Sequence, residues 1–242
     1  MTAISLLELT WPAAAALPND TLGLIPLGAI EQHGPHLPLG TDLLIARALA
    51  RQVAELLSRP VLISPCPTAG LSTHHLAFPG TVSLQPAALV AILDDIVDGY
   101  HRMGVTRIAI FSAHGGNFAF LAEYEHDRDV AAFSDRGRYF STMTDAARAT
   151  GLDIPSTDEH AGALETSQAL AFFPELVGDH ASVQGFVDAF DGWEEELFEH
   201  GIQVLSDQGV LGDPQAATAT AGHAINTALS QMLADGVREE LK

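Results

Sequence analysis

Cysteine and lysine are almost absent from this chain of 242 residues. Cys66 is the only cysteine, which excludes an intrachain disulfide framework and a thiolate zinc cluster. Lys242 is the only lysine, and the arginines are scattered rather than gathered into a stripe. Acidic residues outnumber basic ones by 31 to 11, so the net charge is −20 with neutral histidines. The electrostatic field of this negative charge repels the phosphate backbones of nucleic acids, and we expect no nucleic-acid partner.

Long apolar runs are also missing. No stretch approaches the roughly 20 uncharged apolar residues of a membrane helix. The N-terminal segment 1–18 has no basic region and contains Glu8, which argues against a signal peptide and for a soluble, cytoplasmic protein without a membrane partner. The composition, 47% hydrophobic and 17% charged, is that of a globular protein. The length favours a single domain over residues 1–242.

Short apolar runs alternate with longer segments of helical spacing. Strands are predicted at Leu22–Leu27, Val61–Ser64, Arg107–Ser112 and Arg138–Met143, and helices at Asp42–Ser58, Pro86–Met103, 117–132, Gly162–Phe173 and Ala216–Leu233. The stretch Val177–Asp213 has no clear period and is read as an irregular excursion. This alternation predicts an α/β fold with a mostly parallel sheet covered by helices on both faces.

The segment after the first long strand carries the densest group of potential ligands. In EQHGPHLPLGTD, Glu31 and His33 are two residues apart and point the same way if the backbone is extended. The prolines and glycines that follow turn the chain, which returns Asp42 to the same place. Such mixed oxygen and nitrogen ligands suit zinc, manganese or ferrous iron. The alternative is that Asp42 caps a helix and His33 belongs to a turn, with neither binding a metal.

A second candidate follows the strand Arg107–Ser112, in the sequence AHGGN. His114 stands at the end of this strand, where ligands of open parallel sheets bind. The glycines at 115 and 116 would also suit a phosphate, but the sequence has no GxGxxG fingerprint and no P-loop lysine. We therefore expect His114 to be a metal ligand, the alternative being a buried structural histidine.

Two further segments carry histidines or carboxylates. In DEHAGALETS, His160 and Glu165 lie close together if a helix begins at Gly162, unless Glu165 faces solvent. In THHLAFPGT, adjacent histidines of an extended chain point apart, so only one of His74 and His75 is expected at the site. The remaining histidines with no expected role, interpreted as surface residues, are His101, His126, His180, His200 and His223.

Taken together, these blocks resemble those of the creatininase (creatinine amidohydrolase) family. The resemblance rests on EQHGPHLPLGTD, HHLAFPGT, AHGGN, HAGALETS and the late GVLGDP, and extends from about Leu22 to the last helix. It implies a three-layer αβα sandwich with two divalent metal ions (zinc, manganese or iron) that hydrolyses a non-peptide C–N bond, often as a homo-hexamer. Two such ions can share a water molecule and lower its pKa toward neutrality.

The resemblance also implies roles for individual residues. Glu31, Asp42 and His114 match the ligands of one metal. His33 and Asp42 match ligands of the other metal, so Asp42 would bridge the two. Creatininase has a carboxylate at the position of Gly116, so Glu165 is expected to supply the missing ligand. His160 matches the proton shuttle of the family, and its unperturbed pKa near 6.5 suits protonation of a leaving nitrogen. His75 and Gly116 are assigned to substrate binding.

The expected substrate is a small amide, formamide or lactam. Creatininase covers its ring with tryptophans, whereas the only tryptophans here are Trp11 and Trp193, outside the stretch from His114 to His160. The HGGN form at 114–117 resembles the branch of the family that contains formamide deformylases and a peptidase of mycofactocin maturation. Creatinine is therefore expected to be a poor substrate.

Other functions remain alternatives at this point. They are creatininase activity itself and a metal-binding scaffold that has lost catalysis. A Ser-His-Asp hydrolase would need a G-x-S-x-G elbow, which the sequence lacks. A Rossmann-type nucleotide binder is disfavoured because the glycine fingerprint is also missing.

Overall fold

A five-stranded parallel sheet forms the centre of the molecule in the computed structural model, which describes residues 3–126 and 128–241. The strands are β1 (Ala3–Ser5), β2 (Leu22–Leu27), β3 (Val61–Ile63), β4 (Arg107–Ser112) and β5 (Ala131–Phe133), in the order β1-β3-β2-β4-β5. Leu22 of β2 is in register with Val61 of β3 on one side and with Arg107 of β4 on the other. All four pairings are parallel, which confirms the predicted α/β fold.

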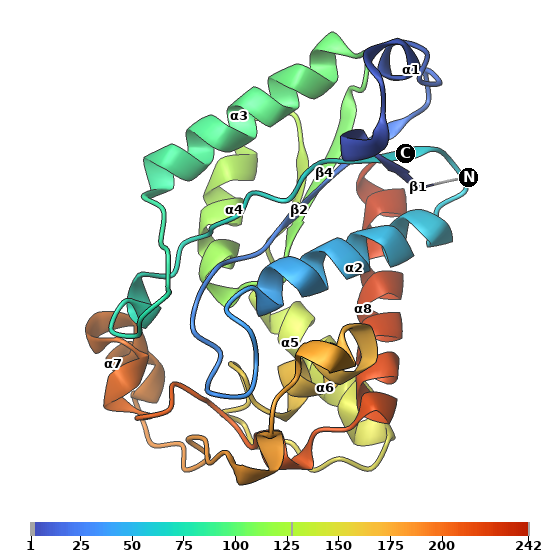
Figure 1. The fold of residues 1–242 in the computed structure, drawn as a ribbon. Helices are drawn as coiled ribbons and strands as arrows, with labels where there is room; N and C mark the ends of the chain where they lie inside the picture. The colour runs from blue at the N-terminus through green and yellow to red at the C-terminus, as the bar shows by residue number, and fades with distance from the viewer. Residues whose placement is uncertain (1–2, 127, 242) are drawn as a thin grey trace.

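Helices cover both faces of the sheet (Figure 1). They are α1 (Trp11–Ala15), α2 (Thr41–Leu56), α3 (Pro86–Arg102), α4 (Phe118–His126), α5 (Arg136–Ala149), α6 (Ala163–Phe172), α7 (Trp193–His200) and α8 (Ala219–Glu240). Alternate residues of β4 point to opposite layers: Ile108 and Ile110 pack on α3 and α4, and Ala109 and Phe111 pack on the side of α2 and α8. The layers therefore stack as αβα. No helix of the described residues has the length and apolarity needed to cross a bilayer.

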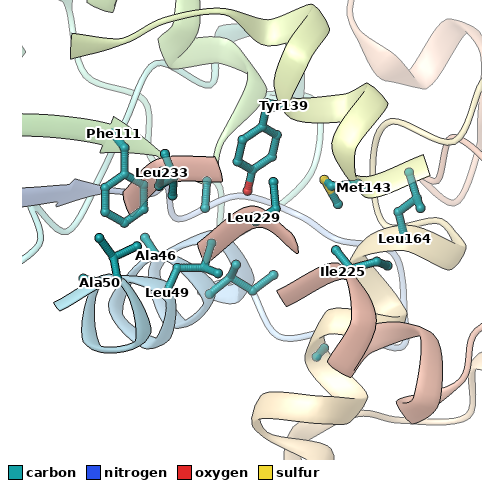
Figure 2. Packing of buried hydrophobic residues seen from close by; sticks show 14 of the residues in the cluster. Ala46, Leu49, Ala50, Phe111, Tyr139, Met143, Leu164, Ile225, Leu229 and Leu233 are labelled. Atoms are coloured by element: carbon teal, nitrogen blue, oxygen red, sulfur yellow. The ribbon is translucent and has the colours of Figure 1, made fainter. Parts of the chain in front are cut away.

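The larger core lies between the sheet and the layer formed by α2, α5, α6 and α8. Figure 2 shows Phe111 of β4 facing Ala46, Leu49 and Ala50 of α2. Leu229 and Leu233 of α8 pack near Tyr139 and Met143 of α5, and Ile225 of α8 lies toward Leu164 of α6. This packing holds α2 and α6 in place, and both helices carry candidate ligands in their first turn.

Several predicted elements differ from the observed ones. The segment Arg138–Met143, predicted as a strand, lies inside α5. The helix predicted for 117–132 ends at His126, and the chain then forms β5. The last helix begins at Ala219 and continues to Glu240, seven residues beyond the predicted end at Leu233. The excursion Val177–Asp213 contains α7, whose Trp193 and Leu197 form a small cluster with Leu211.

Candidate metal centre

The predicted site residues meet beyond the carboxyl edge of the sheet. Because the strands are parallel, the loops after β2, β3 and β4 leave at the same edge (Figure 1). They bring together Glu31, His75 and His114, which line one pocket. His160 and Glu165 line the same pocket from the segment before and within α6. This segment follows the helix α5, and not a strand as predicted.

Three buried carboxylates lie together here: Glu31 and Glu165 line the pocket, and Asp42 lies behind the lining, next to His114. Glu31, Asp42 and Glu165 are 0%, 1% and 8% exposed, and within the described chain no lysine or arginine forms an ion pair with them. Both carboxylate oxygens of Glu31 and Oδ2 of Asp42 are buried without a hydrogen-bond partner among the described residues. Buried charge is costly unless it is paired or coordinates a metal. The cluster therefore requires positive charge.

His33 presents one ring nitrogen to these carboxylates. Its Nδ1–H donates to the backbone carbonyl of Glu31 (3.1 Å), which leaves Nε2 directed inward. Nε2 lies 2.9 Å from Oδ1 of Asp42 and 3.7 Å from Oε2 of Glu165. Burial alone would lower the pKa of His33, but the carboxylates of Asp42, Glu165 and Glu31 raise it to about 10. This position thus strongly favours a cation.

His114 has the same arrangement on the opposite side of Asp42. Its Nε2–H donates to the carbonyl of Leu71 (3.0 Å), and its Nδ1 lies 3.3 Å from Oε1 of Glu31. The same Nδ1 lies 3.2 Å from Oδ2 of Asp42. The two oxygens of Asp42 therefore face two different histidines. The N-cap of α2 is Gly40, so Asp42 does not have the capping role that was the alternative.

Glu165 faces the centre from the first turn of α6. Burial and the nearby Asp42 carboxylate together raise the pKa of its carboxyl to about 8, although His33 opposes the shift. The backbone N–H of Ala161 donates to its Oε2 (2.6 Å), which orients the side chain. Ala161 has a φ of 53°, in the left-handed region that costs a non-glycine residue about 1 kcal/mol or more. This turn separates His160 from the start of α6.

His160 lies at the pocket wall with one nitrogen occupied. Its Nε2–H donates to the carbonyl of Gln32 (2.8 Å), so Nδ1 is the free acceptor and lies 3.6 Å from Oε1 of Glu31. Burial and the nearby ring of His33 keep its pKa well below the ordinary value. The ring contacts both His33 and His75, with centroids 4.3 Å apart in each case.

His74 and His75 both line the pocket, so the prediction that only one would face the site was wrong. They lie in a 3₁₀ helix, Thr73–His75, in which successive residues are about 120° apart rather than on opposite faces. His75 Nε2 is 3.5 Å from Oε1 of Glu31, and its Nδ1 accepts from the side-chain amide of Gln32. Of the five histidines expected at the surface, four are exposed, and His180 is half-buried.

Some residues of the site were not singled out from the sequence. Gln32 lies between two candidate residues of the same loop, and its Nε2 also donates to the carbonyl of Gly209 (2.8 Å). Asn117 accepts from the backbone of Leu71 and donates to Ser112, which fixes the loop after β3 against β4. Asp158 accepts hydrogen bonds from the first N–H groups of α6. These roles depend on contacts between distant segments, which the sequence alone does not show. For Asn117, the motif GGN directly after a strand was an available signal of a role at the site.

Gly116 lines the pocket directly beside His114. A side chain there would collide with the ring of His114 and with the carbonyl of Leu71, the two groups that form the hydrogen bond described above. Glycine at this position therefore leaves room for the ring of His114.

We expect Gly116→Ala to displace the ring of His114 and weaken metal binding. Loss of an outer partner of a ligand typically costs about 10- to 100-fold in metal affinity or activity. Competitive titration with a metal chelator measures the affinity. Gly115→Ala is the matched control, because its added carbon would meet only Phe140 at 3.9 Å. Metal affinity equal to that of the parent protein in Gly116→Ala would contradict the expected crowding.

The donor set fits divalent metal ions. Three groups of ligand atoms each lie within 4.8 Å of one another: Glu31, Asp42 and His114; His33, His160 and Glu165; and Glu31, His75 and His160. Imidazole nitrogens and carboxylate oxygens suit zinc, manganese and iron. The inward nitrogens of His33 and His114 and the unpartnered carboxylate oxygens are donors of the kind that such ions need, and metal binding would displace the protons of these two rings.

The chain is similar to several known proteins over most of its length. Residues 7–237 match the family model described as "Creatininase: Creatinine amidohydrolase". The "Mycofactocin precursor peptide peptidase" of Mycolicibacterium smegmatis is 35% identical, covering 89% of this chain and 83% of its own. The "Creatinine amidohydrolase" of Pseudomonas putida is 29% identical, covering 96% and 95%.

Solved structures show the same fold. A structure described as "Creatininase Mn" is 27% identical, with a TM-score of 0.78 and 98% of both chains covered. A mutant creatininase described as "Zn-Zn type" is also 27% identical, with a TM-score of 0.79 and 99% coverage of both chains. Because the family model matches nearly the whole chain, this protein belongs to the creatininase family.

Proposed function

We propose that the protein is an amidohydrolase that uses two divalent metal ions to cleave a non-peptide C–N bond of a small amide, formamide or lactam. One observation carries the proposal: three buried carboxylates face histidine nitrogens whose opposite ring nitrogens donate to backbone carbonyls. Membership of the creatininase family supports the same reaction class. A single domain, cytoplasmic location and a homo-oligomer, a hexamer by resemblance, stay predictions.

Five residues are the proposed ligands. Glu31, Asp42 and His114 would hold one ion, and His33, Asp42 and Glu165 the other, with one oxygen of Asp42 directed to each. Divalent ions at such a site lower the pKa of a water molecule and polarise an amide carbonyl. The carboxylates of Glu31, Asp42 and Glu165 balance most of the positive charge of two ions.

The proposed general acid and base is His160. With Nε2–H donated to the carbonyl of Gln32, its Nδ1 accepts a proton at the pocket wall and later delivers it to the leaving nitrogen. Its pKa, held down by burial and by His33, makes the neutral ring the resting form, which is the form needed to accept a proton. His75 is proposed to contact the substrate, since it lines the pocket and its ring is fixed by Gln32.

The pocket walls favour an open-chain amide over creatinine. Among the described residues that line the pocket there is no tryptophan: Trp193 is buried in the small cluster of α7, and Trp11 is exposed on α1. Stacking on large aromatic faces is a major contribution to binding a planar ring. The apolar wall here consists of Phe140, Leu197, Phe198, Ile202 and Leu211.

A substrate panel tests this proposal. We expect the metal-loaded protein to hydrolyse at least one small amide, formamide or lactam, to lose the activity on chelation and to regain it when manganese or zinc is restored. A short peptide is included because relatives of 33–35% identity are named for a precursor peptide, and turnover of the peptide alone would contradict the non-peptide bond of the proposal. Creatinine turnover with kcat/KM of about 10⁴ M⁻¹s⁻¹ or above would contradict the substrate choice and favour creatininase activity. Stoichiometric metal without turnover of any amide would favour an inactive scaffold.

A further inference from the structure

Arg136 is the one lysine or arginine among the described residues that line the pocket. It is the first residue of α5, where the positive end of the helix dipole disfavours a cation. The N-terminus of α5 already has a cap, because the side chain of Asp135 accepts from the backbone N–H of Arg138. Helix stability therefore does not explain an arginine at position 136.

The guanidinium group is held at the pocket mouth by two contacts. One Nη2–H donates to the carboxylate of Glu159, which is largely buried, and the group lies 5.1 Å from the ring centroid of Phe140. A guanidinium has five N–H donors, and Arg136 forms no other side-chain hydrogen bond with the described residues. Its side chain is 32% exposed, so donors remain accessible from the pocket.

The positive charge of Arg136 acts on other groups that line the pocket. Burial lowers the pKa of His74 to about 4, and Arg136 contributes to the lowering together with His114. On the other side, burial raises the pKa of Glu159, Arg136 opposes this, and Glu194 of α7 adds to it. Arg136 and Glu159 both line the pocket, so their ion pair is part of its lining.

We propose that Arg136 is a specificity-determining residue that binds a carboxylate group of the substrate. The inference rests on the proposed amidohydrolase function and narrows its substrate class to amides carrying a carboxylate a few bonds from the scissile C–N bond. The planar fork of arginine matches a carboxylate through two parallel N–H···O bonds. Glu159 and Phe140 hold the fork, so little side-chain freedom is lost when the substrate binds.

Matched ligands test the inference on the metal-loaded protein. N-formylglycine and N-formylglycinamide differ in their negative charge, and hydrolysis of the first adds one water to give formate and glycine. We expect calorimetry to show about tenfold or tighter binding of N-formylglycine, and kinetics to show the same preference mainly in KM. Arg136→Gln should abolish the preference while the neutral amide still binds, and Arg136→Lys should retain part of it.

Arg138→Gln is the control, since Arg138 is an exposed residue of the same helix outside the pocket. Equal binding of the two ligands to the parent protein, or a preference that survives in Arg136→Gln, would overturn the inference. Turnover of both ligands at equal KM would overturn the inference and leave the proposed function intact. Selective binding that Arg136→Gln abolishes, without turnover of any amide, would support the carboxylate site and contradict the proposed hydrolysis.

Discussion

Asp42→Ala is expected to lower the bound metal further than any other single ligand substitution. The two oxygens of Asp42 face different histidines, 2.9 Å from Nε2 of His33 and 3.2 Å from Nδ1 of His114, so its removal affects both ions. Glu165 faces only the side of His33, and Glu165→Ala should therefore affect one ion. Elemental analysis after gel filtration gives the metal content per subunit.

Two comparisons separate loss of ligation from loss of folding. Asp42→Asn keeps the shape of the side chain at the start of α2, and its circular dichroism should match that of the parent protein. Asp95→Ala removes an exposed acid from α3 and controls for the change in net charge. Two metals per subunit in Asp42→Ala would rule out a bridging carboxylate at this position.

His160→Ala is expected to retain both metals and to lower kcat by about 10²–10⁴-fold, the usual contribution of a proton shuttle. The proposed ligand sets do not include His160, and its Nε2 is already bonded to the carbonyl of Gln32. Kinetics and metal analysis on the same preparation give the two readouts, and added imidazole should restore part of the rate. His223→Ala, on the exposed face of α8, serves as the control.

The outcome that would contradict this role is a loss of bound metal in His160→Ala. His160 also belongs to two of the three groups of close potential ligands, with His33 and Glu165 and with Glu31 and His75. If His160→Ala is purified with one metal fewer than the parent protein, His160 is a ligand and the assigned role in proton transfer is wrong.

The fold could be predicted where the burial pattern is uniform. β2 and β4 have the predicted bounds because both are mainly apolar and are covered on both faces, apart from the exposed Arg107 at the start of β4. α3 begins at the predicted Pro86, which suits the first turn, and ends at Arg102, one residue before its predicted end. β1 and β5 were missed because each has only three residues, too few to show a period, and contains alanine, which is disfavoured in strands; β3 is as short, but its residues Val61–Ile63 are all large and apolar.

The error at Arg138–Met143 has a physical reason. Its aromatic residues favour strands, but Tyr139 and Met143 are four residues apart, which places them on one helical face against α8 (Figure 2). The local sign of a helix in the sequence was Asp135, a residue type that favours the N-cap position and that caps α5 in the structure. Tertiary packing on α8 outweighs the strand preference of the segment.

The candidate site could be predicted where its residues lie within one loop or directly after a parallel strand, as His114 does. Glu31, His33 and Asp42 are close in sequence, and the spacing of turns brings them together. Two other contacts could not be predicted, because they join distant segments. The ion pair of Arg136 with Glu159 depends on the packing of α5, and the hydrogen bond of Gln32 with Gly209 depends on the packing of the excursion 177–213. A sequence pattern of period two also could not indicate the 3₁₀ turn that directs both His74 and His75 inward.

Anomalous diffraction from crystals grown with manganese or zinc tests the dinuclear site most directly. We expect two anomalous peaks per subunit, about 3.5–4 Å apart. One should lie among Glu31, Asp42 and His114, and the other among His33, Asp42 and Glu165. A single peak at this site, or metal bound only elsewhere on the molecule, would contradict the dinuclear centre.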